Sequence, residues 1–113
     1  MEQEVKTITS DEGLKIIEEN KGNPDFVVLD VRTEPEFKAG HLKNAVNLDI
    51  YSPDFMEDVA KLNKEKVYFV YCQSGRRSLA ATEQIMKHLG FQHLYHLAPG
   101  FNDWESKGYP TEK

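Results

Sequence analysis

Cys72 is the residue of this chain best suited to covalent chemistry. It is the single cysteine, and it directly follows the apolar run Val67–Tyr71. The segment after it, Gln73–Ser78, is polar and contains a glycine and two arginines. A loop that leads from a strand into a helix aims backbone N–H groups and the positive end of the helix dipole at its centre, where an anion fits. A thiolate is such an anion, so we expect Cys72 to be a nucleophile activated by this loop.

The residues of the loop fit this expectation better than a purely structural role does. Arg76 and Arg77 supply positive charge that would attract an anionic substrate, and Gly75 permits a close backbone approach. A free cysteine is often a small buried hydrophobe, but that interpretation leaves the glycine and the paired arginines unexplained. We therefore take as the candidate site the catalytic residue Cys72 and the substrate-binding loop Gln73, Ser74, Gly75, Arg76, Arg77 and Ser78.

The length of the loop favours sulfur transfer over other thiol chemistry. A cysteine protease needs a histidine base, and although the chain has four histidines, it has no papain-like or caspase-like signature around Cys72. A thiol activated by its loop needs no base when the leaving group departs as an anion, as in sulfur or phosphoryl transfer. Cysteine phosphatases place an arginine six positions after the cysteine, whereas here that position is Ser78 and Arg77 falls one residue short. A phosphatase or arsenate reductase is therefore the less favoured alternative.

Short apolar segments alternate with amphipathic ones, which predicts an α/β domain with a mainly parallel sheet flanked by helices. Thr9 and Glu12 form a capping-box pattern for the first helix. The expected strands are 5–8, 26–29, 45–48, 67–71 and 94–97, and the expected helices after the first are 34–38, 54–62, 78–89 and 101–107.

Length and composition indicate one ordinary globular domain. We expect residues 1–113 to form it, with an ordered core at about 5–108 and a loosely held tail at 109–113. The net charge of −5 argues against a nucleic-acid partner. No leader pattern or apolar run of membrane-spanning length is visible, so we expect no membrane association and a cytoplasmic location.

Other polar residues have structural interpretations. Asp30 and Arg32 follow a predicted strand near the site, and we interpret them as a buried ion pair, joined by Glu36, in preference to a second layer of the site. His41 is expected to make a local hydrogen bond. His93 and His96 would point to opposite faces of a strand, so no metal site is expected.

Taken in order along the chain, these motifs resemble the rhodanese (thiosulfate sulfurtransferase) family. The matching segments cover nearly the whole sequence: Leu29–Arg32, Glu36–Phe37 with Gly40–Leu42, Asn44–Asn47, Cys72–Ser78, and Leu97–Phe101 with Trp104. One departure is Pro99, where a second glycine often precedes Gly100.

The resemblance implies a single rhodanese-like domain with a five-stranded parallel sheet between helices. Cys72 would take a sulfane sulfur from a donor such as thiosulfate, with backbone N–H groups of the loop bonded to the persulfide. That sulfur would pass to cyanide or a thiol acceptor, which includes sulfur-relay proteins. No cofactor is implied beyond the covalent persulfide on Cys72. The alternative within this fold is a persulfide carrier or interaction module without turnover.

Overall fold

The computed structural model describes residues 4–113, which alternate between strands and helices. The elements are β1 (Val5–Ile8), α1 (Ser10–Glu19), β2 (Phe26–Asp30), α2 (Glu34–Ala39), β3 (His41–Leu42), β4 (Val46–Asn47), α3 (Phe55–Ala60), β5 (Val67–Tyr71), α4 (Arg76–Leu79), the π-helical η1 (Ala80–Met86), β6 (His93–Leu97), α5 (Gly100–Ser106) and β7 (Thr111–Glu112). The capping box predicted for α1 is confirmed, because Thr9 and Glu12 exchange side-chain-to-backbone hydrogen bonds.

A five-stranded parallel sheet forms the centre of the molecule, in the order β1-β6-β5-β2-β4. This confirms the predicted α/β architecture. The middle strand, β5, is buried on both faces, with Tyr68 and Val70 on one side and Phe69 and Tyr71 on the other. A continuous apolar run of this kind is what a parallel strand covered by helices requires.

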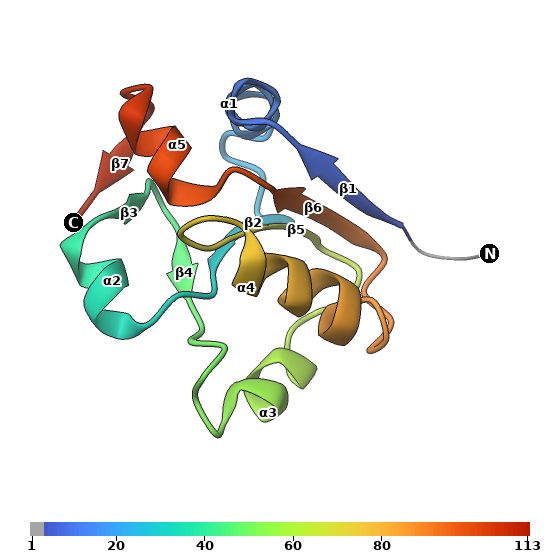
Figure 1. Cartoon of the computed structure of the whole chain (residues 1–113). Coiled ribbons are helices and arrows are strands. Elements are labelled where there is room, and N and C mark those ends of the chain that lie inside the picture. The colour runs from blue at the N-terminus through green and yellow to red at the C-terminus, as the bar shows by residue number, and fades with distance from the viewer. Residues whose placement is uncertain (1–3) are drawn as a thin grey trace.

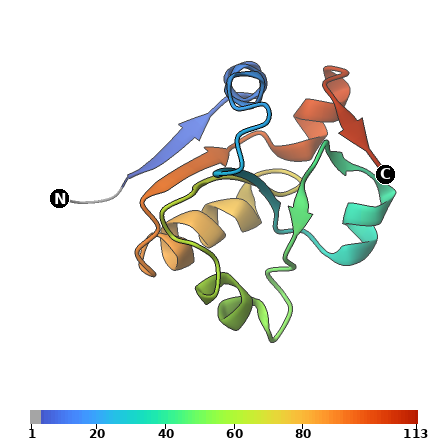
Figure 2. The ribbon, with the colours of Figure 1, turned by 180° about the vertical axis from the view of Figure 1, so that it is seen from behind.

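Helices cover both faces of the sheet. In the two ribbon views, α1 and α5 lie on one face and α3 and the continuous α4–η1 helix on the other (Figures 1 and 2). The two resulting core clusters are centred on Trp104 and Phe69 on the first face, and on Met86 and Phe91 on the second. No helix formed by residues 4–113 has both the length and the apolar character needed to cross a membrane.

Cys72 stands at the carboxyl end of β5 and belongs to the core cluster on the α3–α4 face. Because β2, β5 and β6 are parallel, the loops that follow them emerge at the same edge of the sheet (Figure 1). Ligands of open α/β sheets bind at this edge. The topology therefore brings the segments after Asp30, Tyr71 and Leu97 together, although they are far apart in the sequence.

The helix after Cys72 begins two residues earlier than the sequence predicts, at Arg76 instead of Ser78. Gly75 has a φ of 101°, which turns the chain sharply and lets the helix start at once. From Ala80 the helix continues with π geometry, and the Lys87 N–H bonds to the Thr82 carbonyl at 3.0 Å. The early start places Arg76, Arg77 and Ser78 in the first helical turn.

Two predictions are wrong, one about the length of a strand and one about the C-terminal tail. The strand expected at 45–48 is reduced to the two residues of β4. The tail expected to be loosely held instead forms β7, which pairs antiparallel with β3. The Trp104 indole N–H also donates to the Pro110 carbonyl at 3.0 Å, so the segment is fixed to the core by side-chain and backbone hydrogen bonds.

Candidate active site

The Cys72 sulfur lies inside a ring of hydrogen-bond donors. Cys72 is 1% exposed, and its Sγ is 3.1 Å from the Gly75 backbone N and 3.3 Å from the Ser78 backbone N. The Ser78 hydroxyl oxygen is also 3.3 Å from Sγ. Donors directed at one sulfur stabilise its negative charge, because a hydrogen bond to an ion is stronger than one to a neutral group. This arrangement suits a thiolate or a persulfide anion.

Close backbone contacts hold the loop in this shape. Gly75 faces the Ala98 carbonyl so closely that a Cβ placed on it would stand 2.1 Å from that oxygen. Gly100 similarly lies against the Gln73 carbonyl, at 2.5 Å from the position of a Cβ. The amides of Phe101 and Asn102 then donate to the carbonyls of Cys72 and Gln73. The two glycines thus join the Cys72 loop to the start of α5.

Arg77 is held in place by Glu36. Its two terminal nitrogens contact the two carboxylate oxygens of Glu36 at 2.7 and 2.9 Å. The hydrogen bond from Arg77, aided by the Thr33 backbone N–H, lowers the pKa of Glu36 to about 2. The same bond raises the pKa of Arg77, with a further contribution from the charge of Cys72. Arg77 is therefore a permanent cation near the sulfur.

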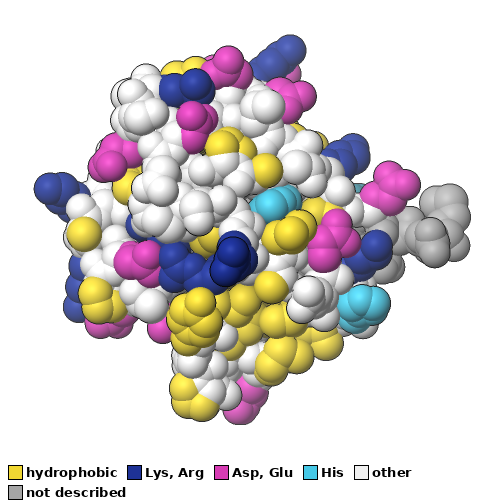
Figure 3. Space-filling view, viewed as in Figure 1, with side chains coloured by type: hydrophobic (Ala, Val, Ile, Leu, Met, Phe, Trp, Pro, Cys, Tyr) yellow, Lys and Arg dark blue, Asp and Glu magenta, His cyan; other side chains and the backbone are white. Residues whose placement is uncertain are grey.

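Arg76 differs from its neighbour. Its side chain is exposed, and no acidic group of residues 4–113 lies within ion-pairing distance of it. In the space-filling view, dark blue side chains gather at the centre of the face that carries the start of α4 (Figure 3). Ser74 is also exposed, whereas Gln73 is half-buried. The structure thus brings all the predicted loop residues to one edge, with different degrees of burial.

Asp30 and Arg32 form the buried ion pair that the sequence predicts, with Arg32 Nη2 2.8 Å from Asp30 Oδ2. Burial opposes the charge of Arg32, but the hydrogen bonds and charge of Asp30 outweigh it and raise the pKa of Arg32. Tyr71 donates its hydroxyl proton to Asp30 Oδ2 at 2.6 Å. The expected participation of Glu36 in this pair is wrong, because that carboxylate is bonded to Arg77 and Thr33.

Arg32 also reaches the Cys72 loop. Its Nη1 donates to Gln73 Oε1 at 2.8 Å, and its guanidinium lies 4.5 Å from the centre of the Phe101 ring. Together they border a hollow of about 220 Å³ whose lining residues are Arg32, Glu36, Ala39, Gly40, Gln73, Phe101 and Glu105. The ion pair is therefore structural and at the same time orients a side chain of the loop.

His96 is the residue that sequence reasoning missed. Its Nε2 lies 2.8 Å from Ser78 Oγ and 3.1 Å from the Gly75 carbonyl oxygen. The ring is 3% exposed, whereas His93 on the same strand is exposed, in agreement with the predicted alternation. His41 makes the expected local hydrogen bond, with Nδ1 2.7 Å from the Phe37 carbonyl oxygen. The available signal for His96 was its place in an apolar strand next to β5.

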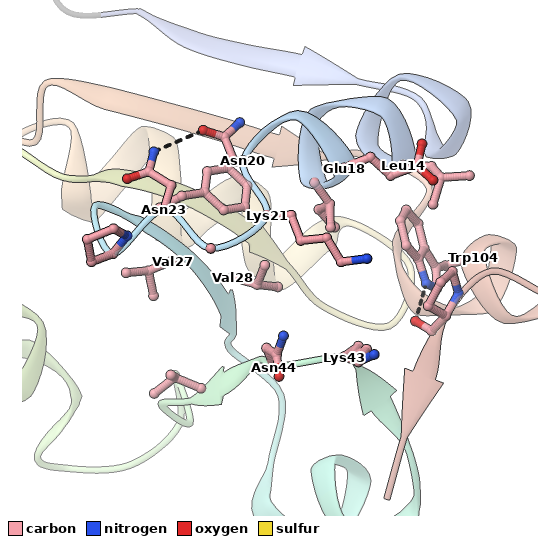
Figure 4. Close-up of a pocket in the computed structure, with 16 residues that line it drawn as sticks. Leu14, Glu18, Asn20, Lys21, Asn23, Val27, Val28, Lys43, Asn44 and Trp104 are labelled. Atoms are coloured by element: carbon pink, nitrogen blue, oxygen red, sulfur yellow. Dashed lines mark hydrogen bonds between the residues drawn. The ribbon is translucent and has the colours of Figure 1, made fainter.

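A wider groove lies away from the sulfur, on the side of α1. It has a volume of about 500 Å³ and runs between α1, β2 and β4, with Trp104 at one end (Figure 4). Its walls combine apolar side chains such as Val27 and Val28 with the polar ends of Lys43 and Asn44. No residue of the Cys72 loop lines it. We refer to it below as the α1 groove.

Comparison with known proteins gives a consistent family. Residues 13–107 match the model of the rhodanese-like domain. The chain is 35% identical over 94 residues to thiosulfate sulfurtransferase 16, chloroplastic, of Arabidopsis thaliana, covering 74% of this chain and 78% of that protein. It is 32% identical to thiosulfate sulfurtransferase GlpE of Coxiella burnetii, covering 77% and 78%.

Two further similarities concern a part of a longer protein and a solved structure. A tRNA uridine(34) hydroxylase of Legionella pneumophila is 37% identical over 82 residues, but these make up 32% of that protein. The crystal structure of a rhodanese-related protein from Thermoplasma volcanium superimposes with a TM-score of 0.76 at 30% identity, covering 95% of this chain and 97% of that one. The fold, the family model and the relatives agree that this chain belongs to the rhodanese-like domain family, and at family level they support a sulfurtransferase.

Proposed function

We propose that the protein moves a sulfane sulfur through a persulfide on Cys72, with thiosulfate or a persulfide as donor and cyanide or a thiol as acceptor. The observation that carries this proposal is the set of three donors, from Gly75 and Ser78, around the buried sulfur. The same donors serve the thiolate before the transfer and the persulfide anion after it. The names of two relatives as thiosulfate sulfurtransferases support the choice of donor.

The proposed reaction has two displacement steps. The Cys72 thiolate attacks the outer sulfur of thiosulfate, a new S–S bond forms, and sulfite leaves with the electron pair of the broken S–S bond. Cyanide or a thiolate then attacks the terminal sulfur of the persulfide, and the Cys72 thiolate departs. Sulfur is transferred as a neutral atom in each step, so no external oxidant or reductant is needed, and the chemistry is that of thiol exchange.

The side chains of the site have distinct parts in this proposal. Arg77, held by Glu36, supplies fixed positive charge near the sulfur, and the exposed Arg76 attracts the anionic donor. Gln73, oriented by Arg32, borders the hollow next to the loop. No step requires a metal or an organic cofactor.

Thiocyanate production from thiosulfate and cyanide tests the proposal. We expect the wild-type protein to form thiocyanate and the Cys72→Ser variant to form none. Full activity in Cys72→Ser would contradict it. Release of nitrophenol from p-nitrophenyl phosphate that depends on Cys72 would instead favour the phosphatase alternative.

A persulfide carrier is the second candidate, because apolar side chains are exposed on the same face as the loop. Tyr51, next to Arg77, is 70% exposed, and Leu79, in the same short helix as Arg76 and Arg77, is 48% exposed. Figure 3 shows hydrophobic side chains gathered just below the basic centre. Such a patch is typical of protein contacts. Weak thiocyanate turnover together with a long-lived persulfide on the purified protein would favour the carrier.

A further inference from the structure

Behind the Ser78 hydroxyl that contacts the Cys72 sulfur lies a histidine, His96, to which the proposed reaction gives no part. His96 contacts Ser78 Oγ through Nε2 at 2.8 Å, and Ser78 Oγ contacts Cys72 Sγ at 3.3 Å. The other ring nitrogen of His96, Nδ1, is buried and has no hydrogen-bond partner within residues 4–113. A buried polar atom of this kind calls for an explanation.

The contacts of His96 decide which ring nitrogen carries the proton. Burial lowers the pKa of His96, so the ring is neutral and has a single N–H. The Gly75 carbonyl can only accept, and its oxygen lies 3.1 Å from Nε2. A proton on Nδ1 would leave the lone pair of Nε2 facing that of the Gly75 carbonyl oxygen. It would also bury the Nδ1 N–H without an acceptor. A proton on Nε2 leaves only one acceptor atom unpaired, so this tautomer is the one that fits.

The tautomer in turn fixes the direction of the Ser78 hydroxyl. With its proton on Nε2, His96 donates to Gly75 O and to Ser78 Oγ, so the hydroxyl cannot donate back to the ring. Its proton can reach either Gly75 O at 3.2 Å or Cys72 Sγ at 3.3 Å. The Gly75 carbonyl already accepts from His96 and from the Leu79 N–H at 3.0 Å. Cys72 Sγ is therefore the acceptor left for this proton.

We propose that His96 is a positioning residue, which directs the Ser78 hydroxyl proton onto Cys72 Sγ and thereby stabilises the thiolate. Its part in sulfur transfer rests on the proposed function, but its effect on the thiolate does not. Without the ring, Gly75 O has a free lone pair, and the Ser78 hydroxyl turns towards it. The sulfur then loses one of its three donors.

Several charged groups surround this chain of contacts and stay unchanged in the variants below. Arg77 acts on Cys72 from α4, with Glu36 and Tyr51 beside it. Glu83 of η1 acts on His96 through its charge. A change caused by replacing His96 or Ser78 is therefore measured against a constant electrostatic background.

Alkylation of Cys72 by iodoacetamide as a function of pH reports the thiolate directly, without any sulfur donor. In Ser78→Ala we expect the midpoint of the rate profile to rise by about one pH unit, because a hydrogen bond to an anion is lost. In His96→Leu we expect a rise of about half a unit or more. In His96→Gln, whose side-chain amide can place a donor near the former Nε2, the midpoint should return to within about 0.3 units of the wild type.

Three results would overturn the proposal. One is an unchanged midpoint in folded His96→Leu, and another is a shift in His96→Gln as large as in His96→Leu. The third concerns the double variant Ser78→Ala with His96→Leu. The proposal fails if its midpoint shift equals the sum of the two single shifts instead of the shift of Ser78→Ala alone. If His96→Leu does not fold, His96→Asn replaces it, because its shorter amide reaches the Nδ1 position and leaves Nε2 without a donor.

The wild-type protein offers an independent test that needs no variant. Nitrogen-15 NMR of the His96 ring should show the proton on Nε2, and a proton on Nδ1 would contradict the proposal. These measurements are separable from the thiocyanate assay. A protein that forms no thiocyanate but shows the expected midpoint shifts would refute the proposed function and leave the role of His96 intact.

Discussion

The Cys72 loop and the α1 groove differ in how their surfaces are made. The groove is larger, at about 500 Å³ against about 220 Å³ for the hollow beside the loop. Its walls are mainly apolar side chains, and among the described residues it contains no cysteine. The loop is small and is built largely of backbone atoms directed at one sulfur. The chemistry of the lining, and not its volume, therefore distinguishes the candidate site from the groove.

The largest difference between the two regions should be the cost in stability of replacing a glycine by alanine. Gly75 in the loop has a φ of 101° and no room for a Cβ, whereas Gly22 at the groove has a φ of 79° and nothing within 4 Å of a Cβ. We expect Gly75→Ala to lower the free energy of unfolding by about 3 kcal/mol or more, and Gly22→Ala by about 1 kcal/mol. Urea unfolding of both variants measures this. Equal losses would show that the loop is not held by the close contact with Ala98.

The cations of the two regions should differ in their effect on the donor. We expect Arg77→Ala to lower kcat/KM for thiosulfate about tenfold, because fixed positive charge near the sulfur is lost. Lys43→Ala removes a cation that lines the groove and should change kcat/KM by less than about twofold. Initial rates of thiocyanate formation over a range of thiosulfate concentrations give both values. A larger effect of Lys43→Ala would place the donor in the groove.

The ion pair that holds Arg77 should appear in the pH dependence of stability. The pKa of Glu36 is about 2 in the folded protein and near 4.5 when free, so its contribution is complete above about pH 4.5 and is lost as the pH falls towards 2. We expect Glu36→Gln to be about 1 kcal/mol less stable than the wild type at pH 7. This difference should shrink between pH 4.5 and 2.

Glu34→Gln is the matched control for that measurement, because its pair with Lys38 is exposed on both sides. It should change stability little at any pH. Denaturant unfolding of both variants at a series of pH values provides the comparison. A difference for Glu36→Gln that stays constant down to pH 2 would contradict the assigned pairing.

The smallest effect on stability and on sulfur transfer should come from replacing an exposed side chain of the α1 groove. Val46 lines it and is 50% exposed. We expect Val46→Ser to change the free energy of unfolding by no more than about 0.5 kcal/mol and to leave sulfur transfer unchanged. Loss of transfer in this folded variant would mean that the groove takes part in the reaction, and the contrast between the two regions would fail.

Local sequence patterns were sufficient to predict most of the framework. The buried strand β5 follows from an unbroken apolar run, and the start of α1 from the spacing of Thr9 and Glu12. The same patterns gave the position of the Cys72 loop and the pairing of Asp30 with Arg32, which are two residues apart. In each case the interacting residues are neighbours in the chain or lie on one element.

The features that were missed depend on contacts between distant residues. Glu36 and Arg77 are 41 positions apart, and Ser78 and His96 are 18 apart, so no local period connects them. Strand β7 is stabilised by its pairing with β3, which lies about 70 residues earlier in the chain, and its own sequence carries no strand signal. The early helix start depends on the positive φ of Gly75, a residue against which the distant Ala98 carbonyl packs so closely that no Cβ would fit.

The most direct test of the central claim is the intact mass of the full chain after incubation with thiosulfate and removal of excess reagent. We expect wild-type protein to gain the mass of about one sulfur atom on Cys72, to lose it on treatment with a reducing thiol or cyanide, and Cys72→Ser to gain nothing. A wild-type protein that shows no reducible gain under these conditions, or a gain of the same size in Cys72→Ser, would contradict the assignment of Cys72 as the residue that takes sulfur from this donor.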